Sequence, residues 1–300
     1  MNEFVKIVEV GPRDGLQNEK QALTVEQRLN FINDLISAGL KSIEVGSCVS
    51  AKWVPQMAQS DELFKLLPQT TDVQFSLLTP NIKGFETAQA VGCKEVAVFT
   101  AASESFTRKN INCSIDESFE KFSDVMNAAK AHNIRVRGYV SCIVDCPYEG
   151  AIAPEQVVKV VKRLYDMGCY EVSLGETIGT ATPDRVQKVW QACLAELDSK
   201  VLAGHFHNTY GMAIANIYQS LQQGIRVFDS SLAGLGGCPY AKGASGNVST
   251  EDLFYLLSHM GFETGIDLEK LMQASQNISN VLNRKSLSNY ANTYWQTKCA

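Results

Sequence analysis

The chain has 300 residues, of which 45% are hydrophobic and 20% charged, a composition typical of a globular protein with a full core. Its formal charge of −5 and the absence of a basic stripe argue against a nucleic-acid or anionic-membrane partner, and no apolar run is long enough to span a membrane. Nine scattered cysteines and an amino terminus without a targeting pattern predict a reducing, cytoplasmic location.

Apolar runs of strand length alternate with amphipathic segments of helix length along the whole chain. Helices are expected to begin at the capping patterns Thr24-x-x-Gln27 and Ser114-x-x-Glu117, and at Pro183, a residue favoured in the first turn. No linker or low-complexity tract interrupts the alternation. The expected strands are residues 4–10, 42–45, 73–78, 95–99, 134–140, 170–174, 201–206 and 226–229.

This alternation predicts the fold class. Strict strand–helix succession requires a parallel sheet, and eight units favour closure into an α/β fold of the (β/α)8 TIM-barrel type, one catalytic domain over residues 1–300. A doubly wound open sheet is the alternative, but the segment 11–15 is not the glycine fingerprint that such a sheet needs to bind a dinucleotide. From about residue 261, helical segments at 268–272 and 278–282 predict a C-terminal helical extension, packed over one face or into a subunit interface.

Polar side chains follow five of the predicted strands at their carboxyl ends, where a TIM barrel carries its chemistry. A charged loop alone is usually just solvated, but five such loops at one rim indicate an active site. The residues concerned are Arg13, Asp14 and Gln17 after the first strand, Glu44 and Ser47 at the second, Glu176 and Thr177 after the sixth, His205, His207 and Asn208 at the seventh, and the segment 234–247 after the eighth.

The segment His205-Phe206-His207 suggests a metal site. Residues two apart on a strand point to the same side, so both imidazoles would face one point, although a polar strand end explains the pair equally well by itself. Asp14 adds a carboxylate and Asn247 an amide oxygen. This oxygen-rich set suits Mg²⁺ or Mn²⁺ better than a closed tetrahedral zinc site, while Asn247 could instead serve a turn.

The glycine-rich segment 234–246 is expected to close over a substrate. It contains Cys238 between Gly237 and Pro239, unlike the other cysteines, which lie in core-like contexts. A thiol there could carry a proton near neutral pH. The alternative is that Cys238 is a small buried residue.

Residues 11–17 together with His205-x-His207 resemble the signature of metal-dependent carbon–carbon lyases and synthases built on a TIM barrel. Over nearly the whole chain the sequence is similar to the 3-hydroxy-3-methylglutaryl-CoA lyase family. The Cys238-bearing segment 233–247 is the most specific part of this resemblance, because the wider superfamily lacks it. The other segments that carry it are 8–20, 52–57, 109–114 and 146–150.

The resemblance implies cleavage of 3-hydroxy-3-methylglutaryl-CoA, a small-molecule CoA thioester, to acetoacetate and acetyl-CoA by a retro-Claisen reaction. It implies Mg²⁺ or Mn²⁺ held by residues matching Asp14, His205, His207 and Asn247, in a homodimer. The resemblance implies that Arg13 stabilises the oxyanion and that Cys238 donates a proton to the enolate. It implies that His205 is both a metal ligand and a proton relay, and that Glu44 orients the site. The residues implied to bind substrate are Arg13, Gln17, Ser47, Ser173 and Thr177.

Two residues depart from the family pattern. Glu176 stands where Asp is expected, and Asn208 follows the second histidine where Asp is common. Both match positions just behind the metal ligands, where a changed charge or length alters metal affinity. A lyase for another branched 3-hydroxyglutaryl-CoA remains an alternative, as does a condensing synthase or 2-oxo acid aldolase. A synthase, however, would need a long further domain.

Overall fold

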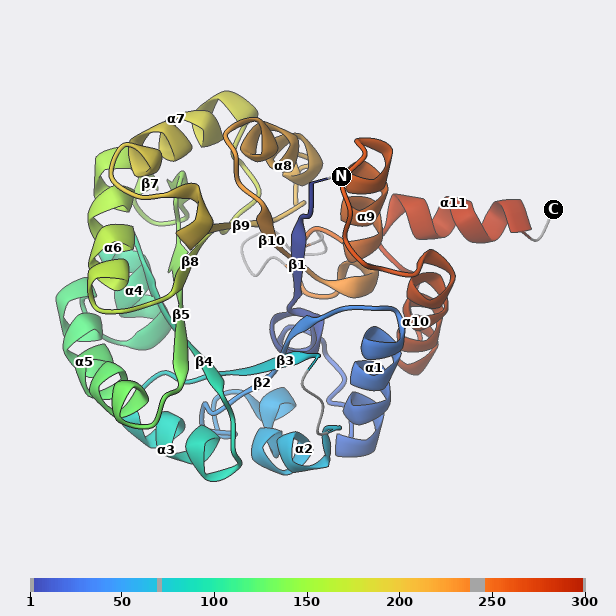
Figure 1. Cartoon of the computed structure of the whole chain (residues 1–300), viewed down its shortest axis with the longest axis horizontal. Coiled ribbons are helices and arrows are strands. Elements are labelled where there is room, and N and C mark those ends of the chain that lie inside the picture. The colour runs from blue at the N-terminus through green and yellow to red at the C-terminus, as the bar shows by residue number, and fades with distance from the viewer. Residues whose placement is uncertain (1–2, 69–71, 238–245, 299–300) are drawn as a thin grey trace.

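Eight parallel strands close into a barrel in the computed structural model, which describes residues 3–68, 72–237 and 246–298. Their order around the barrel is β1-β10-β9-β8-β5-β4-β3-β2, and helices surround them on the outside (Figure 1). The predicted TIM barrel is confirmed. The strands are β1 (Lys6–Glu9), β2 (Ser42–Ser47), β3 (Gln74–Leu78), β4 (Glu95–Ala101), β5 (Arg135–Ser141), β8 (Glu171–Glu176), β9 (Leu202–Phe206) and β10 (Val227–Ser230).

The helices bury their apolar faces against the barrel, and several begin as the sequence predicts. The side chains of Thr24 and Ser114 each accept a backbone N–H three residues on, and Gln27 and Glu117 complete the two capping boxes. The outer helices are α1 (Val25–Ser37), α2 (Ser60–Leu66), α3 (Ile82–Ala90), α4 (Glu104–Ile111), α5 (Ile115–Ala131), α6 (Pro154–Asp166), α7 (Pro183–Leu194), α8 (Ala213–Gln222) and α9 (Thr250–His259).

Several short elements between the longer helices and strands were not expected from the sequence. A five-residue π-helical turn, η1 (Gly11–Gly15), follows β1, and a small hairpin pairs β6 (Asp145–Cys146) with β7 (Gly150–Ala151). Three short 3₁₀ turns also occur, η2 (Pro55–Met57), η3 (Ser199–Val201) and η4 (Leu232–Gly234). These elements are too short for hydrophobic periodicity to reveal, yet η1 carries two of the predicted site residues.

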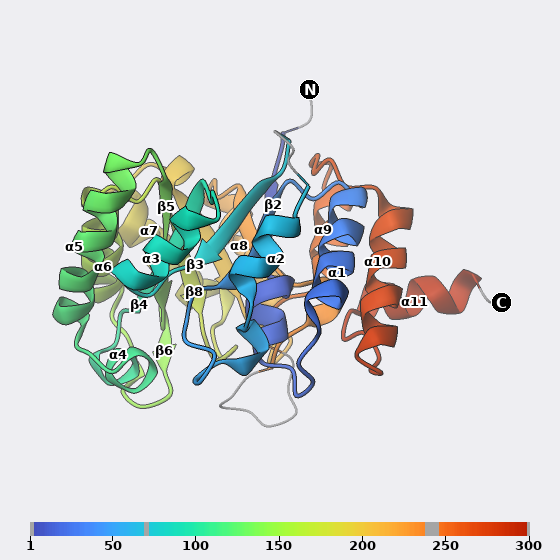
Figure 2. The same cartoon turned by 90° about the horizontal axis from the view of Figure 1, so that it is seen from below.

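The C-terminal extension differs in detail from the prediction. The two expected pieces at 268–272 and 278–282 form most of one helix, α10 (Leu268–Val281), which packs along α1. A further helix, α11 (Asn289–Lys298), contacts α9 and projects away from the barrel in both views (Figures 1 and 2). Among the described residues, no helix has the length and apolar character needed to cross a membrane.

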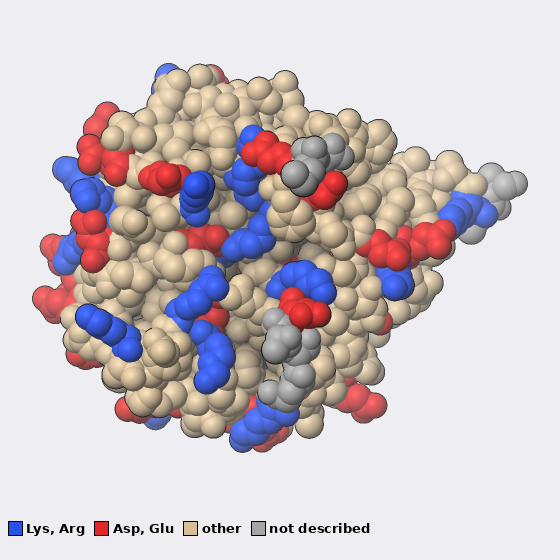
Figure 3. Space-filling model, in the orientation of Figure 1, with Lys and Arg blue, Asp and Glu red and all other residues tan. Residues whose placement is uncertain are grey.

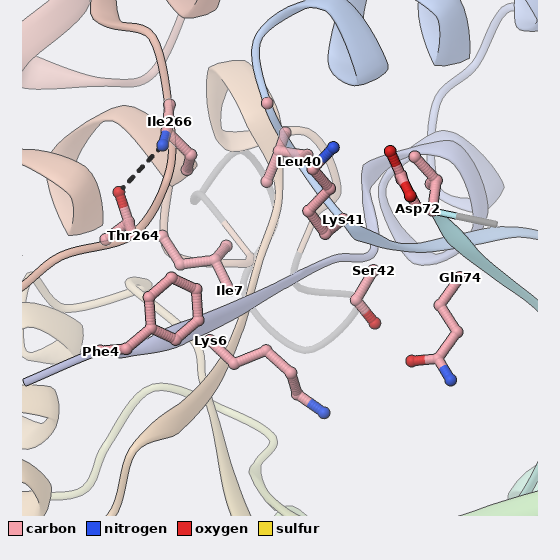
Figure 4. A pocket seen from close by; sticks show the side chains of 12 residues that line it. Phe4, Lys6, Ile7, Leu40, Lys41, Ser42, Asp72, Gln74, Thr264 and Ile266 are labelled. Carbon is pink, nitrogen blue, oxygen red and sulfur yellow. Dashed lines mark hydrogen bonds between the residues drawn. The ribbon is translucent and has the colours of Figure 1, made fainter. Parts of the chain in front are cut away.

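A cavity of about 330 Å³ opens at the amino ends of β1, β2 and β3. Phe4, Lys41 and Gln74 line it (Figure 4), and the ammonium of Lys6 is held there by Glu171 at 2.8 Å. On this face, basic side chains gather around the central hollow, and acidic ones lie between them and at the edge (Figure 3). The chemistry of a TIM barrel lies at the other end, so this cavity is not the candidate active site.

Candidate active site

Three potential metal ligands converge at the carboxyl end of the barrel. Asp14 lies in η1, His205 near the end of β9 and His207 just beyond it, and their ligand atoms lie within 4.8 Å of one another. The turn that presents Asp14 is tight, because the carbonyl of Val10 accepts the N–H groups of Arg13, Asp14 and Gly15. Residues from opposite ends of the sequence therefore meet at one point.

Asn247 completes the cluster. Its Nδ2 donates to Asp14 Oδ2 at 2.8 Å and to the carbonyl of Leu235, and its backbone forms a bridge with His207. Among the described residues, neither Asn247 Oδ1 nor His207 Nδ1 has a hydrogen-bond partner, although both atoms are buried. Buried acceptors without partners are rare in folded proteins. The buried Asn247 oxygen beside a carboxylate and two imidazoles fits a divalent cation that prefers oxygen and imidazole ligands.

The local electrostatics suit a cation at Asp14 and His207, whereas at His205 the charges of Asp229 and Asp14 outweigh burial and raise the pKa. Burial alone would raise the pKa of Asp14, but the charges of Arg13 and the two histidines outweigh it and hold that pKa below its usual value. Burial, together with the neighbouring His205, lowers the pKa of His207 to about 4. At neutral pH the cluster thus offers an ionised carboxylate and a neutral His207 imidazole, the protonation states that bind metal.

Behind the cluster, Asp229 orients His205. Its Oδ2 lies 3.2 Å from His205 Nδ1 and accepts the Ser173 hydroxyl at 2.7 Å, while its Oδ1 accepts Arg137 Nη2 at 2.8 Å. Although burial opposes ionisation, Arg137 and His205 hold the pKa of Asp229 well below its usual value. An ionised Asp229 requires Nδ1 of His205 to carry the proton, which leaves Nε2 for the cavity.

Arg13 joins the metal cluster to a second group of polar side chains. Its guanidinium donates to Asp14 Oδ1 and to Glu44 Oε1, each at 2.6 Å. Glu44 also accepts the Tyr139 hydroxyl at 2.5 Å, and Arg137 donates to that hydroxyl at 2.8 Å. Because these groups are buried and each contacts two others, the guanidinium of Arg13 is held rigidly at the cavity.

Of the residues described above, Arg13, Asp14, Tyr139 and the two histidines border a cavity of about 900 Å³. Of the predicted substrate-binding residues, Arg13, Gln17, Ser173 and Thr177 line it. Ser47 does not: its buried hydroxyl donates to the carbonyl of Leu78. Other lining residues are Trp53, Leu78, Pro80, Phe99, Phe106, Lys109, Asn110, Ile111, Val140 and Gly237.

The two departures from the family pattern lie behind the cavity wall. Glu176 is fully buried, and burial raises its pKa to about 7, an effect that the N–H groups of residues 179–181 partly offset. Asn208 is half-buried, and its side-chain oxygen accepts the N–H of Ala213 at the start of α8. Cys238 lies outside the described residues.

The sequence did not single out Asp229, Tyr139 or Arg137. The missed signal was a charged or hydroxyl residue inside an apolar strand. In a closed barrel, every second residue of such a strand points into the interior, so Arg137 and Tyr139 could have been assigned to one face.

Comparisons with known proteins agree with this geometry. Residues 4–278 match the family model described as HMGL-like. The chain is 58% identical over 277 residues to a hydroxymethylglutaryl-CoA lyase of Pseudomonas mevalonii, covering 92% of each chain. It is 55% identical over 287 residues to a 3-hydroxy-3-isohexenylglutaryl-CoA/hydroxy-methylglutaryl-CoA lyase of Pseudomonas aeruginosa, covering 96% of each.

The fold of this chain is also close to that of a solved structure. The crystal structure of a hydroxymethylglutaryl-CoA lyase from Pseudomonas aeruginosa superposes with a TM-score of 0.97 at 53% sequence identity and covers 99% of both chains. The similarity therefore extends over the barrel and its C-terminal helices together.

Proposed function

The chain belongs to the HMGL-like family, and we propose that it cleaves 3-hydroxy-3-methylglutaryl-CoA to acetoacetate and acetyl-CoA. The observation that supports this most strongly is the convergence of Asp14, His205 and His207 at the cavity. The relative from Pseudomonas aeruginosa is named for both a methyl and an isohexenyl branch, so the branch at C3 is the part of the substrate on which family members differ.

We propose that Asp14, His205, His207 and Asn247 hold Mg²⁺ or Mn²⁺. A divalent cation bound there supplies Lewis acidity to the tertiary hydroxyl and free carboxylate of the substrate. The protein contributes the orientation of its ligands: Arg13 and Asn247 each donate to the Asp14 carboxylate, and Asp229 fixes the His205 ring.

Cleavage begins with loss of the hydroxyl proton and breaks the bond between C2 and C3, so that negative charge develops on the thioester oxygen. We assign stabilisation of this charge to Arg13, which lines the cavity and is pinned by Glu44. Because Glu44 is in turn held by Tyr139, little reorganisation is needed as the charge forms.

Two proton transfers complete the reaction. With Nδ1 of His205 bonded to Asp229, we assign Nε2 to the cation, so the hydroxyl proton passes to solvent water in the cavity. The enolate carbon then takes a proton, a role that we propose for Cys238 on the segment that follows Gly237 at the cavity wall.

The CoA portion is proposed to leave the cavity past Trp53 and Lys109. Trp53 is 78% exposed, and the ammonium of Lys109 lies 3.7 Å from the centre of the Tyr148 ring. An exposed indole and a cation at a cavity mouth suit an adenine ring and phosphate groups.

The test is acetoacetate release from 3-hydroxy-3-methylglutaryl-CoA by purified protein with Mg²⁺ or Mn²⁺ and reduced thiols. We expect release by the natural protein, and its near-complete loss in His207→Ala. The matched control is His132→Ala, at an exposed histidine beside Gln89 outside the site, which should leave the rate unchanged. Absence of release by the natural protein would refute the proposal.

We further propose a homodimer in a reducing, cytoplasmic setting. Helix α11 projects from the barrel, and the exposed side chains of Tyr255 and Leu287 lie near it, so we propose that a second copy covers this region. All cysteines among the described residues are free thiols, which fits a reducing compartment. Light scattering should give twice the chain mass of 32.9 kDa, and a monomer would refute the dimer.

A further inference from the structure

A buried arginine, Arg137, lies between the two halves of the candidate active site. It stands in β5 and is only 1% exposed, yet the mechanism described above gives it no role. Burying a charge is costly unless hydrogen-bond partners satisfy it. The partners of Arg137 therefore indicate what this cation achieves in the barrel interior.

Three nitrogen atoms of the guanidinium each have their own acceptor. Nη2 donates to Asp229 Oδ1 at 2.8 Å, Nη1 donates to the Tyr139 hydroxyl at 2.8 Å, and Nε donates to Glu171 Oε1 at 2.7 Å. Asp229 belongs to β10 and Glu171 to β8. Because a guanidinium is planar and its donors point in fixed directions, Arg137 fixes these three groups relative to one another.

The first branch of these contacts leads to the metal ligands. One oxygen of Asp229 accepts from Arg137, and the other lies 3.2 Å from Nδ1 of His205. The two oxygens of a carboxylate share one rigid plane, so the bond to Arg137 sets the direction in which Asp229 meets the His205 ring. The group behind a histidine ligand governs the orientation of the ring and hence its affinity for metal.

The second branch leads to Arg13. The Tyr139 hydroxyl accepts from Arg137, so its one proton is left for Glu44, whose Oε2 lies 2.5 Å away. Burial raises the pKa of Tyr139 well above its ordinary value, which keeps that proton in place. Glu44 in turn accepts Nε of Arg13 at 2.6 Å. Three hydrogen bonds in series thus connect Arg137 to the group proposed to stabilise the thioester oxygen.

From these contacts we infer that Arg137 is a positioning residue that aligns the two halves of the site, holding the His205 ring and the Arg13 guanidinium in one arrangement. The inference rests on the proposed function, in which one substrate molecule spans the metal ligands and Arg13. Misplacing a reacting group by about 1 Å lowers a rate by about 10²-fold. Loss of the three-way contact should therefore affect metal binding and catalysis together.

Arg137→Lys tests the inference, because an ammonium keeps the charge but cannot donate along three fixed directions. We expect its Mn²⁺ affinity, measured by electron paramagnetic resonance, to fall about 10-fold, and its kcat at saturating Mn²⁺ to fall about 10²-fold. Tyr139→Phe breaks only the second branch, so its kcat should fall while its Mn²⁺ affinity stays at the natural value. Glu171→Gln keeps an oxygen that accepts from Nε, so it should leave both quantities nearly unchanged.

A double variant separates positioning from general structural support. Tyr139 acts through the same series of hydrogen bonds, so adding Tyr139→Phe to Arg137→Lys should lower kcat by a much smaller factor than it does in the natural protein. Equal factors in the two backgrounds would overturn the inference, as would natural kcat and Mn²⁺ affinity in Arg137→Lys. If Arg137→Lys failed to fold, natural kcat in Tyr139→Phe alone would still overturn it.

The matched control is Arg28→Lys. Arg28 is also 1% exposed, and it donates to the carbonyl of Ala58 at 2.8 Å and to the Ser60 hydroxyl at 3.1 Å, outside the site. We expect this variant to lose stability but to keep its Mn²⁺ affinity and kcat, and equal losses in the two lysine variants would contradict the inference. No acetoacetate release by the natural protein would refute the proposed function itself, whereas the Mn²⁺ affinity of Arg137→Lys would still test the role of Arg137 at the metal ligands.

Discussion

The two walls of the active-site cavity are built on opposite principles. The polar wall, from η1 and β9, holds Arg13, Asp14 and His205, and each of these has a hydrogen-bond partner that fixes its orientation. The opposite wall, from β3 and β4, presents Leu78 and Phe99, which can discriminate only by shape. The first wall thus determines which reaction occurs, and the second determines which substrates fit.

The largest loss should follow from replacing Arg13, the centre of the polar wall. Arg13→Lys leaves one positive charge but cannot reach both Asp14 and Glu44 with a planar fork. We expect kcat to fall by about 10²–10³-fold, the usual cost of removing one oxyanion donor. Steady-state kinetics with saturating metal would measure it. A variant with nearly natural kcat would remove Arg13 from the reaction.

Asp229 tests whether orientation of the ligands matters separately from their presence. Asp229→Asn should lower Mn²⁺ affinity by about 10–100-fold, as is usual when the group behind a histidine ligand is lost. The matched control is Glu171→Gln, which also takes a carboxylate from Arg137 but does not contact His205. Titration with Mn²⁺, followed by electron paramagnetic resonance, measures the affinity of each variant. Equal Mn²⁺ affinity in the two variants would contradict the assignment.

Glu9 tests the support beneath the polar wall. It is buried, accepts the N–H groups of Gly11 and Leu232, and takes a hydrogen bond from Thr250; burial raises its pKa to about 7. The ordinary pKa of a glutamate is 4.5, so between pH 4.5 and 7 the Glu9 carboxyl loses its proton in the unfolded chain but keeps it in the folded protein. The free energy of unfolding should therefore fall as pH rises through this window, by on the order of 3 kcal/mol.

Glu9→Gln should remove that part of the pH dependence, because its amide can accept the same two N–H groups and donate to Thr250. Denaturant unfolding at pH 5 and pH 8 measures the difference. Glu251, whose pKa burial also raises to about 7, should continue to contribute a fall of the same sign. Identical pH dependence in the natural protein and the variant would show that Glu9 does not titrate in this range.

The smallest effect is expected at the mouth, where both walls end. Lys109→Met should raise KM by roughly 3–10-fold with little change in kcat, because an exposed cation contributes modestly and is screened by salt. Lys188→Met, at an exposed position on α7, is the control. A KM difference that persisted at high ionic strength would contradict an electrostatic role.

Sequence reasoning predicted the barrel and much of the polar wall for the same reason. The strands are rich in apolar residues, and several chemically unusual residues follow them directly, so the ends of the strands locate Asp14 and His207 without further knowledge. The apolar wall left no such trace. Leu78 and Phe99 resemble any core residue in sequence, and only the closed barrel shows that they face the cavity.

The buried charges were missed for a different reason. Asp229 and Arg137 neutralise each other across strands that are far apart in sequence, and no local pattern reports such a pair. Likewise, Ser47 was predicted to bind substrate because it lies at a strand end. The pairing of β2 with β3 shifts register between Glu44 and Gly46, and the Ser47 hydroxyl donates to the backbone carbonyl of Leu78 instead.

The most direct measurement is acetoacetate release from 3-hydroxy-3-methylglutaryl-CoA by protein first stripped with a chelator and then titrated with Mn²⁺. The account predicts no release by the stripped protein and recovery that saturates at one ion per chain, since Asp14, His205, His207 and Asn247 form a single cluster. Undiminished release after metal removal, or no release at saturating Mn²⁺, would contradict it.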